Sequence, residues 1–170
     1  LLNYNMYPFA HIKESDALMT SHCVYKSFDE TPSTLSHILL TDVLRNQIGF
    51  NGLIISDGME MNAIKDYYGI GEGCVMALNA GCDILLLCHE YELQLAAFIA
   101  VKKAVEEGRI LRSTLEEKVE RINLAKEKVL KCTMEQEQSG ASTVSHMDVT
   151  FKGNEATKIE TENYVLTVLM

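Results

Sequence analysis

Three short apolar runs recur along the first half of the chain, at residues 17–20, 53–56 and 83–87. The runs begin 36 and then 30 residues apart, which is the spacing of a strand, a crossover helix and the next parallel strand. Between the runs, residues 35–48 and 72–80 show the apolar periodicity of helices, and a glycine follows each segment. The sequence therefore predicts an α/β fold in which parallel strands alternate with helices.

Two further amphipathic helices are predicted after the third run, at residues 90–107 and 113–131. After the last of these helices the sequence becomes polar and rich in Glu, Gln and Ser, which is typical of a linker. We therefore expect a folded domain at residues 1–132, a linker at 133–148, and a β-prone tail or the start of another domain at 149–170.

Composition and charge narrow the class of protein and of partner. The 170 residues are 47% hydrophobic, enough for a folded core, and the net charge of -9 argues against nucleic acid and anionic membrane surfaces as partners. A neutral or cationic small ligand fits this charge better. No apolar run approaches the roughly 20 residues needed to cross a bilayer, and the irregularly spaced cysteines are typical of reduced thiols. We therefore predict a cytoplasmic protein that binds neither nucleic acid nor membrane.

Polar side chains follow all three apolar runs. Asp57 comes directly after the middle run, His22 follows the first, and His89 follows the third. Because the carboxyl ends of parallel strands meet at one edge of a sheet, we expect Asp57 to lie there between the two histidines. A carboxylate and imidazoles at one edge suit an enzyme site. The competing interpretation is structural, with Asp57 capping the next helix and the histidines bonding loop carbonyls.

Metal and cofactor sites are not predicted. His22, Cys23, Cys88 and His89 could be imagined around zinc, but they lack the short spacing of zinc ligands, and the two cysteines are better interpreted as packing residues. The glycines within residues 69–73 precede a helix. The segment is too short for a phosphate-binding fingerprint, so it predicts a flexible turn.

A set of ordered motifs runs from about Pro8 to Lys131. Its residues are Met19-Thr20-Ser21-His22, Asp29 with Pro32 and Leu35-Ser36, Leu44-Arg45 with Gly49-Phe50-Asn51-Gly52, Ser56-Asp57-Gly58-Met59-Glu60-Met61, and Ala80-Gly81-Cys82-Asp83. In this order the motifs resemble glycoside hydrolase family 3, and in particular its β-N-acetylhexosaminidase branch.

The resemblance implies the C-terminal part of a (β/α)8 TIM-type barrel, with about three βα units followed by helices. It also implies a retaining hydrolase that removes terminal β-linked N-acetylglucosamine from a small glycoside or an oligosaccharide, with Asp57 as the catalytic nucleophile. An aspartate with its ordinary pKa of about 4 is ionised at neutral pH, as this role requires. Met19, His22 and Met61 are implied to bind the substrate.

The sequence departs from the family at the acid and base. The resemblance implies a histidine in a KH...PGHG segment for that role, and this sequence contains no such segment. The sugar-binding Asp, Arg and Lys-His residues of the N-terminal barrel portion are also absent, and a whole barrel takes roughly 250 residues. Gly58 stands where many members have a second acidic residue. The chain is therefore expected to need the missing N-terminal portion of the barrel.

Three alternatives remain open. A phosphorolytic family 3 enzyme would share the nucleophile, with phosphate in place of water. A non-catalytic βα module would use the same strand ends to bind a ligand or a protein partner. An aldolase-type barrel would need a lysine at a strand end, and none of the three apolar runs offers one.

The purified 170-residue chain is expected to hydrolyse 4-nitrophenyl N-acetyl-β-glucosaminide slowly or not at all, because the acid and part of the barrel are missing from it. Release of 4-nitrophenol measures this activity. Ready turnover by the chain alone would show that the expectation is wrong.

Overall fold

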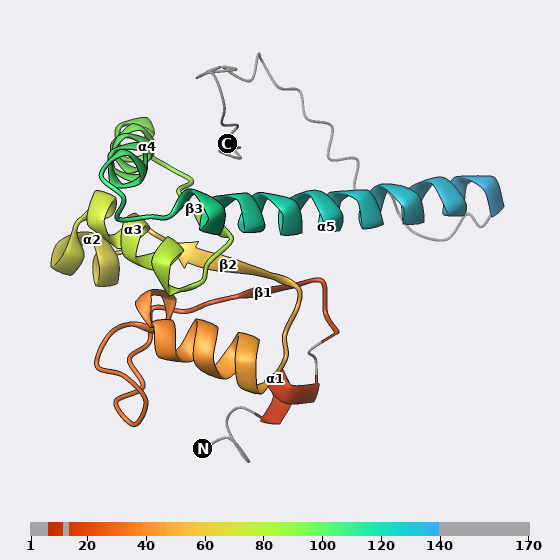
Figure 1. Cartoon of the computed structure of the whole chain (residues 1–170), viewed down its shortest axis with the longest axis horizontal. Coiled ribbons are helices and arrows are strands. Elements are labelled where there is room, and N and C mark those ends of the chain that lie inside the picture. Colours follow the sequence, from red (N-terminus) through yellow and green to blue (C-terminus); the bar gives the residue numbers. More distant parts are fainter. Residues whose placement is uncertain (1–6, 12–13, 140–170) are drawn as a thin grey trace.

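The computed structural model describes residues 7–11 and 14–139, and a parallel sheet lies at its centre (Figure 1). Within these residues the sheet has three strands in the order β1 (Ala17–Met19), β2 (Leu53–Gly58) and β3 (Ile84–Leu86). Both neighbouring pairs are parallel. The three apolar runs are therefore confirmed as adjacent parallel strands, and the middle run is the central strand.

Helical segments connect the strands and follow the last one. They are α1 (Tyr7–His11) before β1, η1 (Ser33–Leu35) and η2 (Ile38–Gln47) between β1 and β2, α2 (Asn62–Tyr68) and α3 (Ile70–Ala80) between β2 and β3, and α4 (Tyr91–Glu106) and α5 (Arg112–Ser139) after β3. Figure 1 shows α3 and α4 side by side at one end of the sheet, η2 in orange along its other side, and α5 extending well beyond it. All four predicted helices are present.

The glycines of residues 69–73 do not form a flexible turn, so that prediction was wrong. Gly69, with φ of 74°, separates α2 from α3, while Gly71 and Gly73 lie inside α3. A Cβ on Gly73 would lie 2.5 Å from Cγ2 of Ile64, and one on Gly71 would lie 2.7 Å from Cβ of Ala100. The two helical glycines therefore allow α2 and α4 to pack closely against α3, which is a tertiary requirement that the local sequence does not reveal.

Two other helices differ in detail from their predictions. Helix η2 is wound as a π-type helix, in which Ile48 N–H donates to the carbonyl of Val43 at 2.9 Å instead of to the carbonyl one residue later. Helix α5 continues eight residues beyond the end predicted at Lys131, to Ser139. The additional residues include Glu and Gln, which are good helix formers, and contain neither Gly nor Pro. The domain limits remain predictions, and residues 140–170 lie outside the described part.

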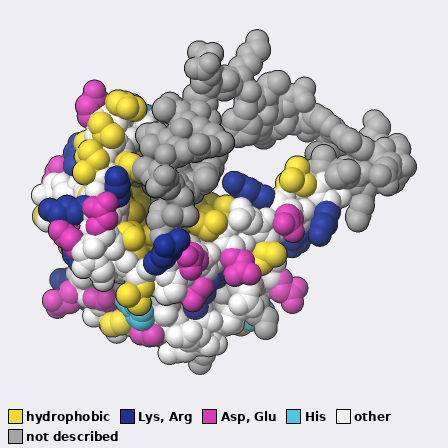
Figure 2. All heavy atoms as spheres, turned by 45° about the horizontal axis from the view of Figure 1, so that its top comes forward, with side chains coloured by type: hydrophobic (Ala, Val, Ile, Leu, Met, Phe, Trp, Pro, Cys, Tyr) yellow, Lys and Arg dark blue, Asp and Glu magenta, His cyan; other side chains and the backbone are white. Residues whose placement is uncertain are grey.

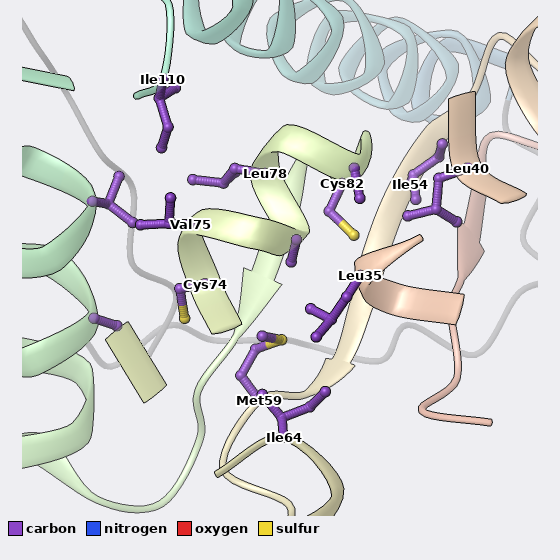
Figure 3. Packing of buried hydrophobic residues seen from close by; sticks show 14 of the residues in the cluster. Leu35, Leu40, Ile54, Met59, Ile64, Cys74, Val75, Leu78, Cys82 and Ile110 are labelled. Atoms are coloured by element: carbon purple, nitrogen blue, oxygen red, sulfur yellow. The ribbon is translucent and has the colours of Figure 1, made fainter. Parts of the chain in front are cut away.

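The hydrophobic core lies between β2 and the helices (Figure 3). Along β2, Ile54 and Ser56 are fully buried, whereas Leu53, Ile55 and Asp57 are only partly buried. This alternation is the period of a strand, so the second set of side chains points to the opposite and more open face of the sheet. Asp57 therefore lies on the open face, at the carboxyl end of the central strand.

Burial also determines the state of two cysteines in the core. Cys74 and Cys82 are fully buried, and burial raises the pKa of both thiols to about 12. These thiols are neutral at physiological pH and act as small apolar groups. The four cysteines whose side chains are described are free, as the sequence predicted for reduced thiols.

A buried carboxylate, Asp83, connects the sheet to two helices. Its Oδ2 accepts hydrogen bonds from Nη2 of Arg45 at 2.6 Å and from Ile54 N–H at 2.9 Å, and its Oδ1 accepts from Nε of Arg121 at 2.9 Å. The Arg45 guanidinium also donates to the carbonyls of Phe50 and Gly52. One side chain at the start of β3 thus links η2, β2 and α5.

The same carboxylate compensates buried positive charge. Lys118 is only 4% exposed, and burial lowers the pKa of both Lys118 and Arg45, while the charge of Asp83 opposes this effect. Buried charges are tolerated when they are paired and hydrogen-bonded. We therefore regard Asp83 and its partners as the polar counterpart of the hydrophobic core.

The loop before η2 is closed by the Asp29 motif. The hydroxyl of Ser36 donates to Oδ2 of Asp29 at 2.6 Å, and Thr31 N–H donates to Oδ1 at 3.2 Å. These bonds, the first above all, lower the pKa of Asp29 despite its partial burial. Oγ of Ser36 also accepts from Leu39 N–H at 3.2 Å, which satisfies a free donor at the start of η2.

Charged and apolar side chains are mixed on the surface. Figure 2 shows acidic and basic side chains interspersed, with hydrophobic side chains exposed among them. Several of the exposed apolar residues are on α5, including Leu124, Val129 and Leu130. None of the described helices has the length and apolar character needed to cross a bilayer.

Replacement of Asp83 by Ala is expected to lower the free energy of unfolding by about 3 kcal/mol, because two largely buried guanidinium groups lose their carboxylate. Urea denaturation followed by circular dichroism measures the change. As a control, Asp42→Ala should change the free energy of unfolding by no more than about 0.5 kcal/mol, because Asp42 is half-exposed and its Oδ2 lies 3.7 Å from Nδ1 of the exposed His37. Equal losses in the two variants would contradict the role of Asp83.

Candidate functional site

Asp57 presents a carboxylate at the carboxyl end of the central strand. Gly58 N–H donates to its Oδ1 at 2.8 Å, and the backbone N–H of Asp57 donates to Oγ1 of Thr20 at 3.3 Å. Oδ2 has no hydrogen-bond partner among the described residues. The N-cap of α2 is Met61, and no side chain caps that helix. The structure therefore excludes helix capping by Asp57 and leaves one carboxylate oxygen available for a ligand.

His22 connects the loop after β1 to the end of β2. Its Nε2 lies 2.9 Å from the carbonyl oxygen of Gly58, and its Nδ1 lies 2.9 Å from Oγ1 of Thr34. Oγ1 of Thr34 lies 2.7 Å from Oγ1 of Thr20, which in turn accepts the N–H of Asp57. A chain of hydrogen bonds thus begins at the backbone of Asp57 and returns to the next residue, Gly58.

Two carbonyl groups fix donors in this chain of hydrogen bonds. A carbonyl only accepts, so Nε2 of His22 carries the proton that binds Gly58. The carbonyl of Ser21 likewise only accepts, so the Thr34 hydroxyl donates to it at 2.9 Å, and the same hydroxyl oxygen lies 2.9 Å from Nδ1 of His22. Oγ1 of Thr34 accepts in turn from the Thr20 hydroxyl, whose oxygen receives the Asp57 N–H. His22 thus links the loop after β1 to the end of β2 through its contacts with Thr34 and Gly58.

A second connection joins the turn after β2 to the loop after β3. Both carboxylate oxygens of Glu60 accept from Cys88 N–H, at 3.0 and 3.2 Å, and Oε1 also bonds Nδ1 of His89. Met59 N–H donates to the carbonyl of Leu86 at 2.9 Å. The turn that begins at Asp57 is therefore held from both neighbouring strands, by His22 on one side and by Glu60 on the other.

Comparison with known proteins identifies the family. The profile described as "Glycosyl hydrolase family 3 N terminal domain" matches residues 1–125. This chain belongs to glycoside hydrolase family 3. Two curated relatives, both named beta-hexosaminidase, are 43% identical over 74 residues in Tolumonas auensis and 37% identical over 100 residues in Histophilus somni. These alignments cover 44% and 58% of this chain, but only 22% and 29% of the relatives.

Solved structures of the family have the same fold. A family 3 β-N-acetylglucosaminidase from Paenibacillus superposes with a TM-score of 0.68 at 33% identity, covering 84% of this chain and 26% of that protein. A β-N-acetylglucosaminidase from Thermotoga maritima gives a TM-score of 0.65 at 34% identity, covering 69% and 27%. This family 3 chain therefore spans less than a third of the length of these relatives. Its α/β fold with a parallel sheet resembles their N-terminal domains.

The predicted substrate-binding residues lie near the ends of β1 and β2. Met19 is the last residue of β1 and is 56% exposed, and Met61 follows the Asp57 turn and is 49% exposed. Met59, between Asp57 and Met61, is instead fully buried in the core. His22 is partly buried, with both ring nitrogens bonded to protein groups. Binding of a sugar by Met19, His22 and Met61 remains a prediction.

Two of the predicted cysteine roles need correction. Cys23 and Cys88 were expected to be packing residues, but both are exposed, because each lies on a loop beyond the end of a strand. Among residues 7–11 and 14–139, no group of three or more His, Cys, Asp or Glu side chains is arranged to hold a metal ion. His89 contacts Glu60, and His22 contacts Thr34, so the two histidines among the four imagined zinc ligands make other contacts.

Sequence reasoning missed three residues that hold this site together. Thr20 and Glu60 lie inside the motifs that resemble the family, but the sequence did not indicate a role for either residue by itself. Thr34 lies in the connection after β1, and its contact with His22 arises only because that loop folds back. The spacing of Glu60, three residues after Asp57, could have indicated a residue on the same turn.

Replacement of Thr34 by Val is expected to lower the free energy of unfolding by about 1–3 kcal/mol, because Thr20 and His22 lose their common hydroxyl partner in a fully buried place. Urea denaturation measures the loss. Thr114→Val on α5 is the matched control and should change stability by no more than about 0.5 kcal/mol. If both variants behave alike, the hydroxyl chain does not stabilise the fold.

Proposed function

We propose that Asp57 is the nucleophile of a retaining glycosidase that removes terminal β-linked N-acetylglucosamine. The observation that carries the proposal is the open carboxylate oxygen at the carboxyl end of the central strand, the position at which barrel enzymes place catalytic groups. The relatives named beta-hexosaminidase and β-N-acetylglucosaminidase support the choice of sugar.

The proposed reaction follows from the geometry of the carboxylate. Oδ2 attacks the anomeric carbon, the bond to the leaving oxygen breaks, and a glycosyl ester forms on Asp57. Water then attacks the same carbon and releases the sugar with its original configuration. Gly58 N–H remains on Oδ1, where it fixes the plane of the carboxylate.

The reaction also needs a proton donor for the leaving oxygen. His22 is unsuited to that role, since its Nε2 proton is held by the Gly58 carbonyl. The family resemblance places the acid on a histidine in a KH...PGHG segment, which this sequence does not contain. We therefore propose that this chain contributes the nucleophile of the enzyme, while the N-terminal portion of the barrel contributes the acid and further sugar-binding residues.

The pocket around the sugar is proposed to use the exposed residues near Asp57. Met19 and Met61 offer apolar thioether surfaces on either side of the strand end. His22 would contact the sugar through the face of its ring, because both nitrogens are already bonded. No cofactor takes part in this chemistry, and the proposed location of the protein is the cytoplasm.

Replacement of Asp57 by Asn in the protein that carries this chain is expected to lower kcat/KM for 4-nitrophenyl N-acetyl-β-glucosaminide by about 10⁴-fold or more, because an amide cannot form the glycosyl ester. The amide oxygen can still accept from Gly58 N–H, so the melting temperature should be close to that of wild type. Thermal denaturation checks the fold of the variant.

Covalent trapping tests the nucleophile directly. Incubation with 5-fluoro-N-acetylglucosaminyl fluoride, whose fluoride leaves without acid assistance, should add one glycosyl mass that peptide mapping places on Asp57. Asp57→Asn should take up no label, whereas Asp66→Asn, on the exposed surface of α2, should be labelled like wild type. Label on another carboxylate, or undiminished turnover by Asp57→Asn, would overturn the assignment.

A further inference from the structure

The end of β2 that carries Asp57 departs from regular strand pairing. Ile55 pairs with Ile84, but the next pair joins Gly58 to Leu86, so three steps along β2 oppose two along β3. Inside this irregularity Leu86 N–H donates to Oγ of Ser56 at 2.9 Å instead of to a backbone carbonyl. A bulge of this kind redirects a side chain next to a site, and it needs support because ladder hydrogen bonds are lost.

Glu60 supplies a support that the ladder lacks. Its side chain is only 14% exposed, although it lies three residues beyond Asp57 on a connecting turn. Both oxygens accept from the backbone N–H of Cys88, and one also bonds the His89 ring. We call this set of bonds the Glu60 latch. It fastens the turn after β2 to the first residues after β3.

The backbone bond is the important part of the latch. His89 is 81% exposed, so water screens its attraction to the carboxylate. The Cys88 N–H is instead a fixed backbone donor, and it binds a carboxylate whose side chain is only 14% exposed. Burial alone would raise the pKa of Glu60, but the bonds from His89 and Cys88 lower it overall, so the carboxylate is ionised at neutral pH.

We propose that Glu60 is a positioning residue, which holds the bulged end of β2 and thereby the carboxylate of Asp57 by binding the loop after β3. The effect of Glu60 on catalysis rests on the proposed role of Asp57. The hydrogen bonds of the Glu60 latch do not depend on that role. His22 holds Gly58 from the opposite side. The end of β2 is therefore held by side-chain contacts from the loops after both neighbouring strands.

Nuclear magnetic resonance of the full chain tests the latch. The amide proton of Cys88 should follow the ionisation of a carboxyl group whose midpoint lies below the ordinary glutamate value, in a titration between about pH 3 and 6. Glu60→Gln should abolish this titration. Asp57 lies three residues from Glu60 and Glu90 two residues from Cys88, and a response that persists in Glu60→Gln would assign the signal to another carboxyl group and overturn the latch.

The Gly58 amide tests whether the latch reaches Asp57, because this proton is bonded to Oδ1 of Asp57. Its chemical shift should change in Glu60→Ala, which removes the acceptor for Cys88 N–H, and remain constant in Glu117→Ala, a matched exposed control on α5. If the Cys88 titration disappears while the Gly58 shift stays the same, the latch does not position Asp57. If the chemical shift of the Cys88 amide proton in the wild-type chain does not change with pH, the latch is refuted. This part of the test therefore does not depend on the folding of any variant.

Activity separates this inference from the proposed function. In the protein that carries this chain, Glu60→Ala, which removes the acceptor for Cys88 N–H, should lower kcat by about 10- to 100-fold with little change in KM, because a displaced nucleophile still permits substrate binding. An unchanged kcat would overturn the positioning role. Retained turnover by Asp57→Asn would overturn the proposed function but would leave the resonance evidence for the latch intact.

Discussion

The structure depends above all on the buried charge of Asp83. This carboxylate binds one guanidinium from η2, another from α5 and a backbone N–H of β2. Apolar contacts have no preferred direction, whereas these hydrogen bonds do. The bonds therefore fix the positions of the two helices against the sheet. Because Arg45 also binds the carbonyls just before β2, the central strand starts at a defined place. The opposite end of that strand, where Asp57 lies, is thereby oriented as well.

The two ends of β2 are stabilised in different ways. At its amino end a buried ionic network connects secondary-structure elements, while at its carboxyl end partly exposed groups connect loops. This division suits a site that must remain open to a ligand. Strong buried ion pairs near Asp57 would compete for its carboxylate, whereas the His22 chain binds the backbone around it and Glu60 binds the loop after β3. The free oxygen of Asp57 is a consequence of this arrangement.

Much of this organisation could be predicted from the sequence. The three strands, their parallel order and the helices between them follow from apolar periodicity, and Asp57 was recognised from its place after the middle strand. The errors have a common cause. Gly71 and Gly73 were taken for a turn because their close contacts with Ala100 and Ile64 join different helices. Cys23 was taken for a packing residue because the path of its loop is not encoded locally.

The sequence by itself determined the family, the α/β class and the identity of the residue at the end of the central strand, because these depend on residue type and spacing along the chain. Only the tertiary structure decided which groups surround that residue. Thr34 reaches His22 across a folded loop, and Glu60 reaches Cys88 across 28 positions of sequence. Hydrogen bonds require atoms to meet within about 3 Å and in the correct direction. That condition is met only after the strands have paired and the loops have closed.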